Sequence, residues 1–169
     1  LTDMVDESDR LIRLVNDLLI LARADAGRNL LQEPVELQPL VNETCRLGRQ
    51  LDPEREILEM SQEFTVLADR DALKQVLLIL LDNALKHTQG TITIATEQVN
   101  GEVCISVSDN GPGIPEDVLP YVFDRFIRGD AEKAVPGFGL GLPIAKALTE
   151  GQGGRIRIES EIGRGSSVK

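Results

Sequence analysis

The chain has 169 residues, 41% of them hydrophobic and 27% charged, which is enough apolar material for one sizeable core and a small appendage. Its formal net charge of −10 excludes a general affinity for nucleic acid, because that affinity depends on clustered Lys and Arg. The same charge means that any phosphate site must gather positive charge locally or take it from a metal ion.

Residues 1–26 are predicted to form a single amphipathic helix. Its apolar seam repeats every seven residues, with further leucines between the repeats, and comprises Met4, Leu11, Leu14, Leu18 and Leu21. Gly27 follows as a C-terminal cap. A surface helix packed on the following domain is one interpretation, but a seam of this kind without a partner helix favours the stalk of a helical bundle.

The next part of the chain alternates short strands with longer helices. Strands are predicted at Glu33–Glu36, Ile57–Met60 and Phe64–Leu67. Apolar residues at helical spacing predict helices at Leu37–Leu51 and Asp71–His87. The second of these helices has one apolar stripe, so it is expected to pack by that face.

A hairpin follows, because residues 91–96 and 103–108 both alternate with period two and Asn100–Gly101 between them is a strong turn signal. A last helix, Leu142–Leu148, and a strand, Arg155–Glu159, are expected after a turn-rich region. The fold class predicted from this order is an α/β (α+β) two-layer sandwich, with a mixed sheet and helices on one face, preceded by a stalk helix from a dimeric bundle.

Five short motifs succeed one another in the chain, and each alone is a weak signal. They are Asn83 on a helix, Asp109-Asn110-Gly111-Pro112-Gly113 at a strand end, the pair Phe123 and Phe126, Gly137-Phe138-Gly139-Leu140-Gly141, and Gly163-Arg164-Gly165-Ser166. The ordered set resembles the N, G1, F, G2 and G3 boxes in the ATP-binding catalytic domain of sensor histidine kinases from two-component systems. Gyrase, the ninety-kilodalton chaperones and the mismatch-repair ATPases share part of this pattern.

The resemblance extends over nearly the whole chain. Leu11 to Arg23 looks like the second helix of the dimerisation and histidine-phosphotransfer stalk in these kinases. The implied domains are a partial stalk at residues 1–27 and the ATP-binding catalytic domain at residues 28–169. The family's final strand is expected to be truncated at Val168-Lys169.

By this resemblance Asn83 is the magnesium ligand, and its hard carbonyl oxygen suits a small hard cation that phosphates also hold. Lys86 is expected to contact phosphate oxygens one turn later. His87 is either a phosphate or ribose contact or an ordinary residue at a helix end. Ile79 departs from the family, because many members have a polar residue one turn before the metal ligand.

Adenine recognition is expected from Asp109, since an ionised carboxylate only accepts hydrogen bonds and therefore selects the exocyclic amino group of the base. Gly111 and Gly113 allow the backbone to approach the ring, and Ile114 offers an apolar face. By the resemblance, Ser166 assists adenine binding near Asp109.

Residues 127–140 are interpreted as a lid loop. The phosphates are expected to contact this loop and the start of the helix that follows it. Gly137, Gly139 and Gly141 are interpreted as a hinge, and free N–H groups at the helix start suit an anion. The expected cofactor contacts here also include Leu140 and Leu142. Arg128 is the expected catalytic arginine by the resemblance, with Arg125 and Lys133 as alternatives, and the two phenylalanines are interpreted as structural.

The implied function is transfer of the terminal phosphoryl group of Mg²⁺-ATP to a stalk histidine outside these residues, for relay to the receiver domain of a response regulator. A homodimer formed by the chain's own stalk helices is implied, with membrane contact only through upstream segments. Cys45 and Cys104 have no disulfide or zinc spacing, which fits a cytoplasmic location. No run approaches the roughly 18 apolar residues of a membrane span.

Two other functions stay open. Ile79 favours a nucleotide-gated interaction module with little phosphotransfer. An ATPase or serine kinase of the same superfamily is disfavoured by the stalk helix. His87 is the sole histidine and is followed by Thr88-Gln89-Gly90, not by the acidic residue that accompanies the family's phosphoacceptor, so we expect no self-phosphorylation.

Overall fold

The structure is a computed structural model that describes residues 2–26, 30–126 and 138–169, with side chains in the first helix at residue 8 and from residue 11 onward. Its elements in chain order are α1 (Thr2–Asp25), β1 (Glu33–Glu36), α2 (Leu37–Leu51), β2 (Ile57–Met60), β3 (Thr65–Ala68), α3 (Arg70–His87), β4 (Ile92–Val99), β5 (Glu102–Asp109), the short 3₁₀-helix η1 (Leu119–Tyr121), α4 (Gly141–Gly151), β6 (Ile158–Glu161) and β7 (Gly165–Val168).

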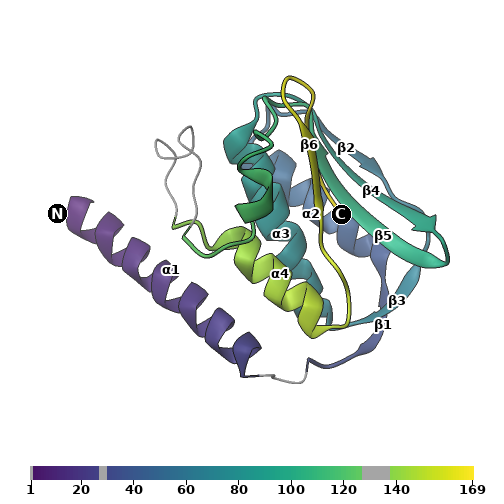
Figure 1. Cartoon of the computed structure of the whole chain (residues 1–169), viewed down its shortest axis with the longest axis horizontal. Coiled ribbons are helices and arrows are strands. Elements are labelled where there is room, and N and C mark those ends of the chain that lie inside the picture. The colour runs from purple at the N-terminus through teal and green to yellow at the C-terminus, as the bar shows by residue number, and fades with distance from the viewer. Residues whose placement is uncertain (1, 27–29, 127–137) are drawn as a thin grey trace.

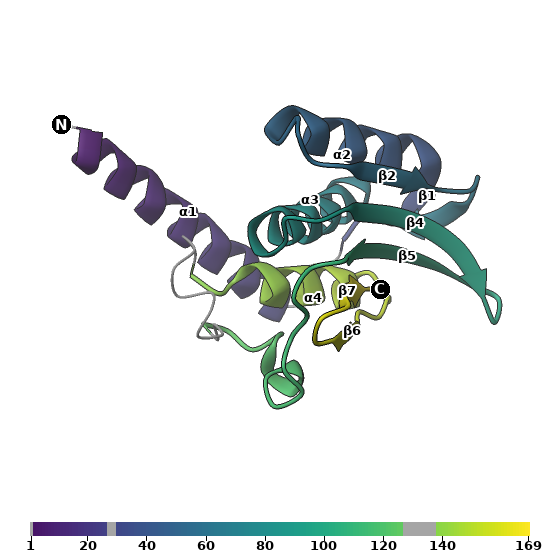
Figure 2. The same ribbon diagram turned by 90° about the horizontal axis from the view of Figure 1, so that it is seen from above.

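The main sheet has five strands in the order β2-β4-β5-β7-β6, and the pair β2–β4 is parallel while the other pairs are antiparallel. Helices α2, α3 and α4 lie together on one face of this sheet, as Figures 1 and 2 show from two directions. Strands β1 and β3 form a separate two-stranded sheet. The expected fold class, a mixed sheet with helices on one face, is confirmed.

Helix α3 forms the centre of the helical layer. Asp69 caps its start, because a side-chain oxygen accepts from the Ala72 N–H at 3.0 Å. Five residues of its expected apolar stripe are buried, namely Val76, Leu77, Leu80, Leu81 and Ala84, while Leu73 is partly buried against the core and Ala72 is buried in addition. The stripe joins one continuous core with residues of α2, β4 and α4, and this fixes which side of α3 remains outside the core.

The hairpin β4–β5 is paired over all eight residues of each strand. Asn100 and Gly101 both have positive φ, 53° and 84°, as a tight two-residue hairpin turn requires. Ile92, Ile94 and Thr96 alternate inward and are buried. The register places Asp109, the last residue of β5, opposite Ile92 at the end of the sheet that is farthest from the turn.

The strand expected at Arg155–Glu159 is wrong in its position. Strand β6 begins only at Ile158, although Arg157 exchanges two backbone hydrogen bonds with Lys169 at 2.8 and 2.9 Å. Strand β6 is confined to the residues that pair with Gly165–Val168 of β7, and the Arg157–Lys169 pair extends this ladder by one position. Smaller shifts occur at Thr65–Ala68 and Gly141–Gly151, which begin or end one to three residues from the expected bounds.

Helix α1 packs on α4 by one side (Figure 2). Leu21 is buried and Leu14 is packed against the core, whereas Leu11 and Leu18 are 53% and 41% exposed. The predicted seam is therefore divided between a face that contacts the globular part and a face that is open; Met4 lies outside the described side chains. None of the helices in the described ranges is long and apolar enough to cross a membrane.

Candidate functional site

Asn83 lies half-buried on α3 where the N-terminus of α4 crosses it. A Cβ added to Gly141 would lie 3.7 Å from Asn83 Oδ1 and 3.3 Å from Ile79 Cγ2. The absence of a side chain at Gly141 therefore lets the first turn of α4 approach the amide. The N-cap residue of that turn is Leu140, which makes no side-chain cap bond and is buried in the core. The corner where the first turn of α4 meets Asn83 therefore combines a side-chain carbonyl oxygen, which suits a hard cation, with helix N–H groups, which suit phosphate.

Lys86 and His87 are both exposed in the last turn of α3. Lys86 Nζ lies 2.5 Å from Asp82 Oδ2 in an ion pair whose side chains are 40% and 53% exposed. An exposed pair of this kind contributes little free energy, so a phosphate group can compete for the ammonium. The structure thus brings Lys86 to the side of α3 that carries Asn83, with Asp82 as its present partner.

Asp109 ends β5 half-buried, and its Oδ1 accepts a hydrogen bond from the Gly111 N–H at 2.8 Å. No group within the described residues donates to its other oxygen, Oδ2. A Cβ on Gly111 would lie 2.8 Å from both Asp109 Oδ1 and Thr88 Oγ1. The loop after β5 is therefore held tightly, with one carboxylate oxygen left as an acceptor for a ligand donor.

Gly113 lies against the turn between β6 and β7. It has φ of 75°, and an added Cβ would lie 2.2 Å from the Glu161 carbonyl oxygen. The Gly163 N–H donates to the Pro112 carbonyl at 2.9 Å. The backbone of Glu161 and Ile162 thus occupies the space that a side chain at Gly113 would need. Ile114, the next residue, is half-buried.

Ser166 stands directly opposite Asp109 in the pairing of β5 with β7. Its hydroxyl lies 2.8 Å from that of Ser160, which also accepts from the Ile114 N–H at 2.8 Å and donates to the Gly165 carbonyl at 3.0 Å. Ser160 therefore joins the loop that carries Ile114 to strand β7, which carries Ser166. Sequence reasoning missed Ser160, since nothing in the spacing of a serine within a strand indicates such a role.

Thr88 was also missed. It is only 2% exposed, and its hydroxyl accepts from the Gly90 N–H at 3.0 Å. A Cβ on Gly90 would overlap Asn110 Oδ1 at 1.7 Å. The loop from α3 to β4 therefore contacts the loop that carries Asp109. The buried Thr88 joins the Asn83 end of the site to the Asp109 end.

The segment with the two phenylalanines lies beside α4 and α1. Lys146 Nζ lies 5.9 Å from the centre of the Phe123 ring, and the Phe126 N–H donates to the Gly139 carbonyl at 3.1 Å. Arg125 forms two hydrogen bonds with the Asp25 carboxylate at the end of α1, at 2.9 and 2.7 Å. Arg125 is therefore directed to the end of α1, not to the corner at Asn83.

Several expected residues fall outside the described part of the chain, namely Arg128, Lys133 and Gly137, together with most of the expected lid at 127–140. Gly139, Leu140 and Leu142 lie within it, beside Gly141. The described residues hold no group of three or more His, Cys, Asp or Glu that could bind a metal ion. A magnesium ion at Asn83 would therefore take most of its ligands from phosphate oxygens and water, and a single amide oxygen fits that donor set.

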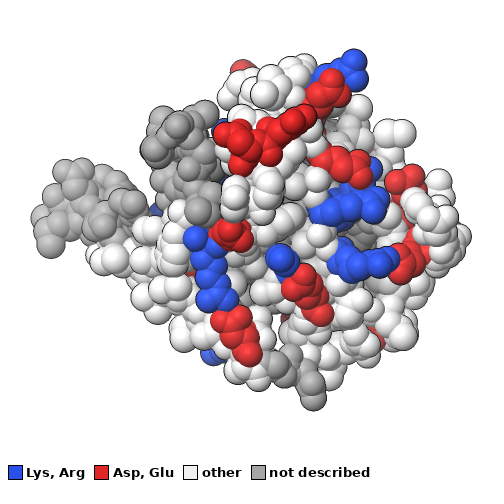
Figure 3. All heavy atoms as spheres, viewed as in Figure 1, with Lys and Arg blue, Asp and Glu red and all other residues white. Residues whose placement is uncertain are grey.

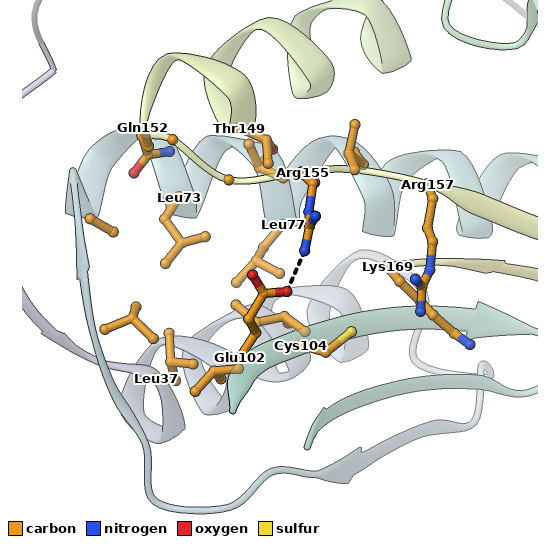
Figure 4. Close-up of a pocket in the computed structure, with 18 of the residues that line it drawn as sticks. Leu37, Leu73, Leu77, Glu102, Cys104, Thr149, Gln152, Arg155, Arg157 and Lys169 are labelled. Atoms are coloured by element: carbon orange, nitrogen blue, oxygen red, sulfur yellow. Dashed lines mark hydrogen bonds and ion pairs between the residues drawn. The ribbon is translucent and has the colours of Figure 1, made fainter. Parts of the chain in front are cut away.

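A hollow of about 800 Å³ opens at the end of β5 that is farther from Asp109 (Figure 4). Leu37, Leu73 and Leu77 line its interior, and an ion pair between Arg155 and Glu102 spans its opening. It lies beside the part of β5 that β7 does not cover, because β7 pairs only with Val107–Asp109. The lining includes none of the residues expected to contact the nucleotide, so it is a separate feature.

Charge on the face in Figure 3 is mixed, with basic side chains next to acidic ones. Lys169 and Arg157 both pair with Glu159, and Arg164 pairs with Glu161. These described cations therefore already have acidic partners. Among the described residues, the α4 N-terminus and Lys86 can supply positive potential near Asn83, and the expected Arg128 lies outside the described residues.

Residues 68–169 match the family described as "Histidine kinase-, DNA gyrase B-, and HSP90-like ATPase". The sensor histidine kinase YkoH of Bacillus subtilis is 33% identical over 96% of this chain and 36% of its own length. The probable sensor histidine kinase TcrY of Mycobacterium tuberculosis is 37% identical over 95% of this chain and 35% of its own length. The chain thus spans about a third of the length of these relatives.

Solved structures agree with these matches. The crystal structure of full-length ShkA in complex with AMPPNP superposes with a TM-score of 0.86 at 32% identity, covering 99% of this chain and 36% of that one. The mycobacterial sensor histidine kinase MprB superposes with a TM-score of 0.72 at 27% identity, covering 81% of this chain and 93% of that one.

Proposed function

Because the chain belongs to the family of histidine kinase-, DNA gyrase B- and HSP90-like ATPases, with sensor histidine kinases as its relatives, we propose that it binds Mg²⁺-ATP and transfers the terminal phosphoryl group to a histidine on a stalk helix. The observation that carries this proposal is the approach of the α4 N-terminus to Asn83 at Gly141. An AMPPNP complex of the similar ShkA supports an adenine nucleotide as the ligand.

Each half of the site has a separate task in this function. Asp109 Oδ2 accepts a hydrogen bond from the exocyclic amino group of adenine, while Oδ1 keeps its hydrogen bond from the Gly111 N–H. The first-turn N–H groups of α4 orient the phosphates, and Asn83 Oδ1 would hold the magnesium ion that the phosphates also bind. Lys86 neutralises part of the phosphate charge after exchanging Asp82 for phosphate. Bound magnesium supplies charge neutralisation at the phosphates. The phosphorus–nitrogen bond forms at the acceptor ring as the bond to ADP breaks.

The acceptor must come from outside these residues. His87 is the sole histidine, and it lies one turn after Asn83 on the same helix, so its ring cannot lie in line with a phosphate held at Asn83. We propose that residues 1–27 belong to the stalk and residues 28–169 to the catalytic domain. The stalk would dimerise with a second copy, and a response regulator receiver domain in the cytoplasm would take the phosphoryl group onward.

The test is phosphorylation with labelled ATP and magnesium. The 169-residue chain alone should remain unlabelled, and a stalk protein that carries the acceptor histidine should gain acid-labile label when the chain is added. His87→Asn should behave like the unchanged chain in this assay. Acid-labile label on His87 in the chain alone would contradict the division between pocket and acceptor.

A nucleotide-gated interaction module is the second candidate, and Ile79 favours it. Its Cγ2 lies 3.3 Å from the Cβ position of Gly141, so an apolar group occupies the side of Asn83 where a polar partner would orient the amide. In that case ATP should change the affinity for the stalk protein while no label is transferred. Transfer in the assay above would eliminate this candidate.

A further inference from the structure

Arg55 is a buried arginine in the turn between α2 and β2, and sequence reasoning did not single it out. Its side chain is only 4% exposed. Burying a guanidinium costs free energy unless its donors are paired, so the partners of Arg55 identify the segments that it connects. Asp52, three residues earlier, supplies the opposite charge at 3.2 Å.

The other partners of Arg55 all lie in the loop that joins α3 to β4. Nη1 donates to the Thr88 carbonyl at 2.5 Å and to the Gly90 carbonyl at 3.5 Å, and Nη2 donates to Gln89 Oε1 at 3.5 Å. Three consecutive residues, thirty-three to thirty-five positions away, are thus held by one planar group. The fork of donors in a guanidinium can satisfy several acceptors at once, which a lysine ammonium on a flexible stem does less well.

Thr88 is the C-terminal cap of α3, so Arg55 places a positive charge at the negative end of the helix that carries Asn83. Its carbonyl lies beyond the last helical turn and has no intrahelical partner of its own. Arg55 supplies that partner from another part of the chain. The end of α3 and the start of β4 are thereby fixed to the turn after α2.

The loop that Arg55 holds, Thr88–Gly90, packs directly against the loop that follows Asp109. Gly90 lies so close to Asn110 that an added Cβ would be 1.7 Å from Asn110 Oδ1, and Thr88 Oγ1 lies 2.8 Å from the Cβ position of Gly111. Gly111 in turn donates to Asp109 Oδ1. An unbroken series of contacts therefore leads from the guanidinium to the carboxylate.

Building on the nucleotide site proposed above, we infer that Arg55 is a positioning residue for adenine recognition. It holds Thr88–Gly90 in place, and this loop keeps the Asp109 carboxylate turned so that Oδ2 faces the base. Arg55 itself does not touch the nucleotide. Loss of the guanidinium should let the Asp109 loop shift, and the preference for adenine over guanine should fall together with the affinity.

The test compares ATP and GTP affinities, measured by calorimetry without metal, for the unchanged chain, Arg55→Met and Arg55→Lys. Arg55→Met should bind ATP about tenfold more weakly, the change that corresponds to losing one hydrogen bond to a charged group. Its ratio of ATP to GTP affinity should fall by a similar factor. Arg55→Lys, which keeps the charge but not the fork, should lie between the two.

Arg49→Met is the matched control. Arg49 Nη2 donates to the Ile57 carbonyl at 2.6 Å, so this variant also removes an arginine-to-carbonyl bond near the start of β2, but one that leads away from Thr88–Gly90. Its ratio of affinities should equal that of the unchanged chain. Hydrogen exchange at the Gly111 amide should accelerate in both Arg55 variants and not in Arg49→Met.

An unchanged ratio of ATP to GTP affinity in a folded Arg55 variant would overturn the role, whatever happens to thermal stability. Thermal unfolding identifies the temperature at which each variant is folded, and if Arg55→Met does not fold, Arg55→Lys decides the question by the same ratio. If the unchanged chain itself bound neither nucleotide, the proposed function would fail instead. The two failures are therefore distinguishable.

Discussion

The two ends of the candidate site are built differently. Around Asp109, backbone from three distant segments is in close contact, and Gly111, Gly113 and Gly165 each leave no space for a side chain. Around Asn83, the N-cap residue of α4, Leu140, makes no side-chain cap bond, and the described partner of Lys86 is the exposed Asp82. The base end is preformed by packing, whereas the phosphate end presents groups that a ligand has to engage.

This difference predicts whether a substitution at each end should affect stability, nucleotide affinity or phosphoryl transfer. Changes that disturb the packing at the base end should alter both the stability of the fold and the affinity for nucleotide, because the same contacts serve both. Changes at the phosphate end should leave folding nearly unaffected and alter the chemistry. The four predictions below test this contrast in order of expected size.

The largest effect is expected from Gly165→Ala. Gly165 has φ of 102°, and an added Cβ would lie 1.9 Å from the Asp109 carbonyl oxygen, which is backbone and cannot move aside cheaply. We expect a loss of at least about 3 kcal/mol in the free energy of unfolding, measured by denaturant titration, and loss of ATP binding.

Gly163→Ala is the control for that variant, because Gly163 has φ of 81° in the same turn with nothing within 4 Å of the added atom. It should cost only about 1 kcal/mol, the price of the backbone conformation alone. Equal losses in the two variants would mean that contact with β5 does not stabilise the base end.

Asn83→Ala should have the next largest effect, and it should be confined to chemistry. Transfer to a supplied stalk protein should fall about a hundredfold in the presence of magnesium, because the amide oxygen matters most when charge moves between phosphate oxygens. Affinity for ATP without magnesium should change by no more than about twofold. Asn42→Ala, at an exposed position on α2, should leave both unchanged.

If binding without metal and transfer fell equally in Asn83→Ala, Asn83 would be a structural residue. The contrast between the two ends would then be lost, since a substitution at the phosphate end would behave like one at the base end.

Asp109→Asn should weaken ATP binding by about 1 to 3 kcal/mol in calorimetry. The amide oxygen can keep the bond from the Gly111 N–H, so the loop should stay in place, while the new NH₂ group faces the amino group of adenine. Asp117→Asn, at an exposed position after the loop, should bind ATP as the unchanged chain does. Normal affinity in Asp109→Asn would exclude Asp109 from adenine recognition.

The smallest effect is expected from Asp82→Asn, which removes the exposed ion pair with Lys86. Stability should change by no more than about 0.5 kcal/mol, and ATP affinity should rise by roughly twofold as the ammonium becomes free for phosphate. Glu150→Gln removes the same charge and breaks the equally spaced pair with Lys146 on α4.

Affinity should be unchanged in Glu150→Gln if the gain at Asp82 is local. A gain of equal size in both variants would indicate a general effect of net charge, which should then disappear at high salt.

Much of the fold was predictable because its signals are local. The apolar stripe of α3 and the alternation around Asn100–Gly101 appear within single elements, and both predictions are confirmed. The motif order likewise identified the family from residues that are close in sequence. The positions of Asn83, Gly141 and Asp109 on their elements followed from the same patterns, while their nucleotide roles and that of Ser166 stay predictions.

The strand at Arg155–Glu159 was wrong because alternation shows that a segment can form a strand but not where its partner begins. The seam of α1 was divided for a similar reason, since a heptad pattern does not distinguish a face that meets α4 from one that stays open. In both cases the deciding neighbour lies far away in the sequence.

The sequence by itself determined most of the elements, the family and the chemical types of the residues in the site, because periodicity and motif order are properties of neighbouring residues. Only the tertiary structure decided that Ser160 joins Ile114 to Ser166, that Arg125 faces Asp25, and that Arg55 holds Thr88–Gly90. Hydrogen bonds between distant segments depend on how the layers pack, and a single polar residue in a turn or strand carries no periodic signal of its partner.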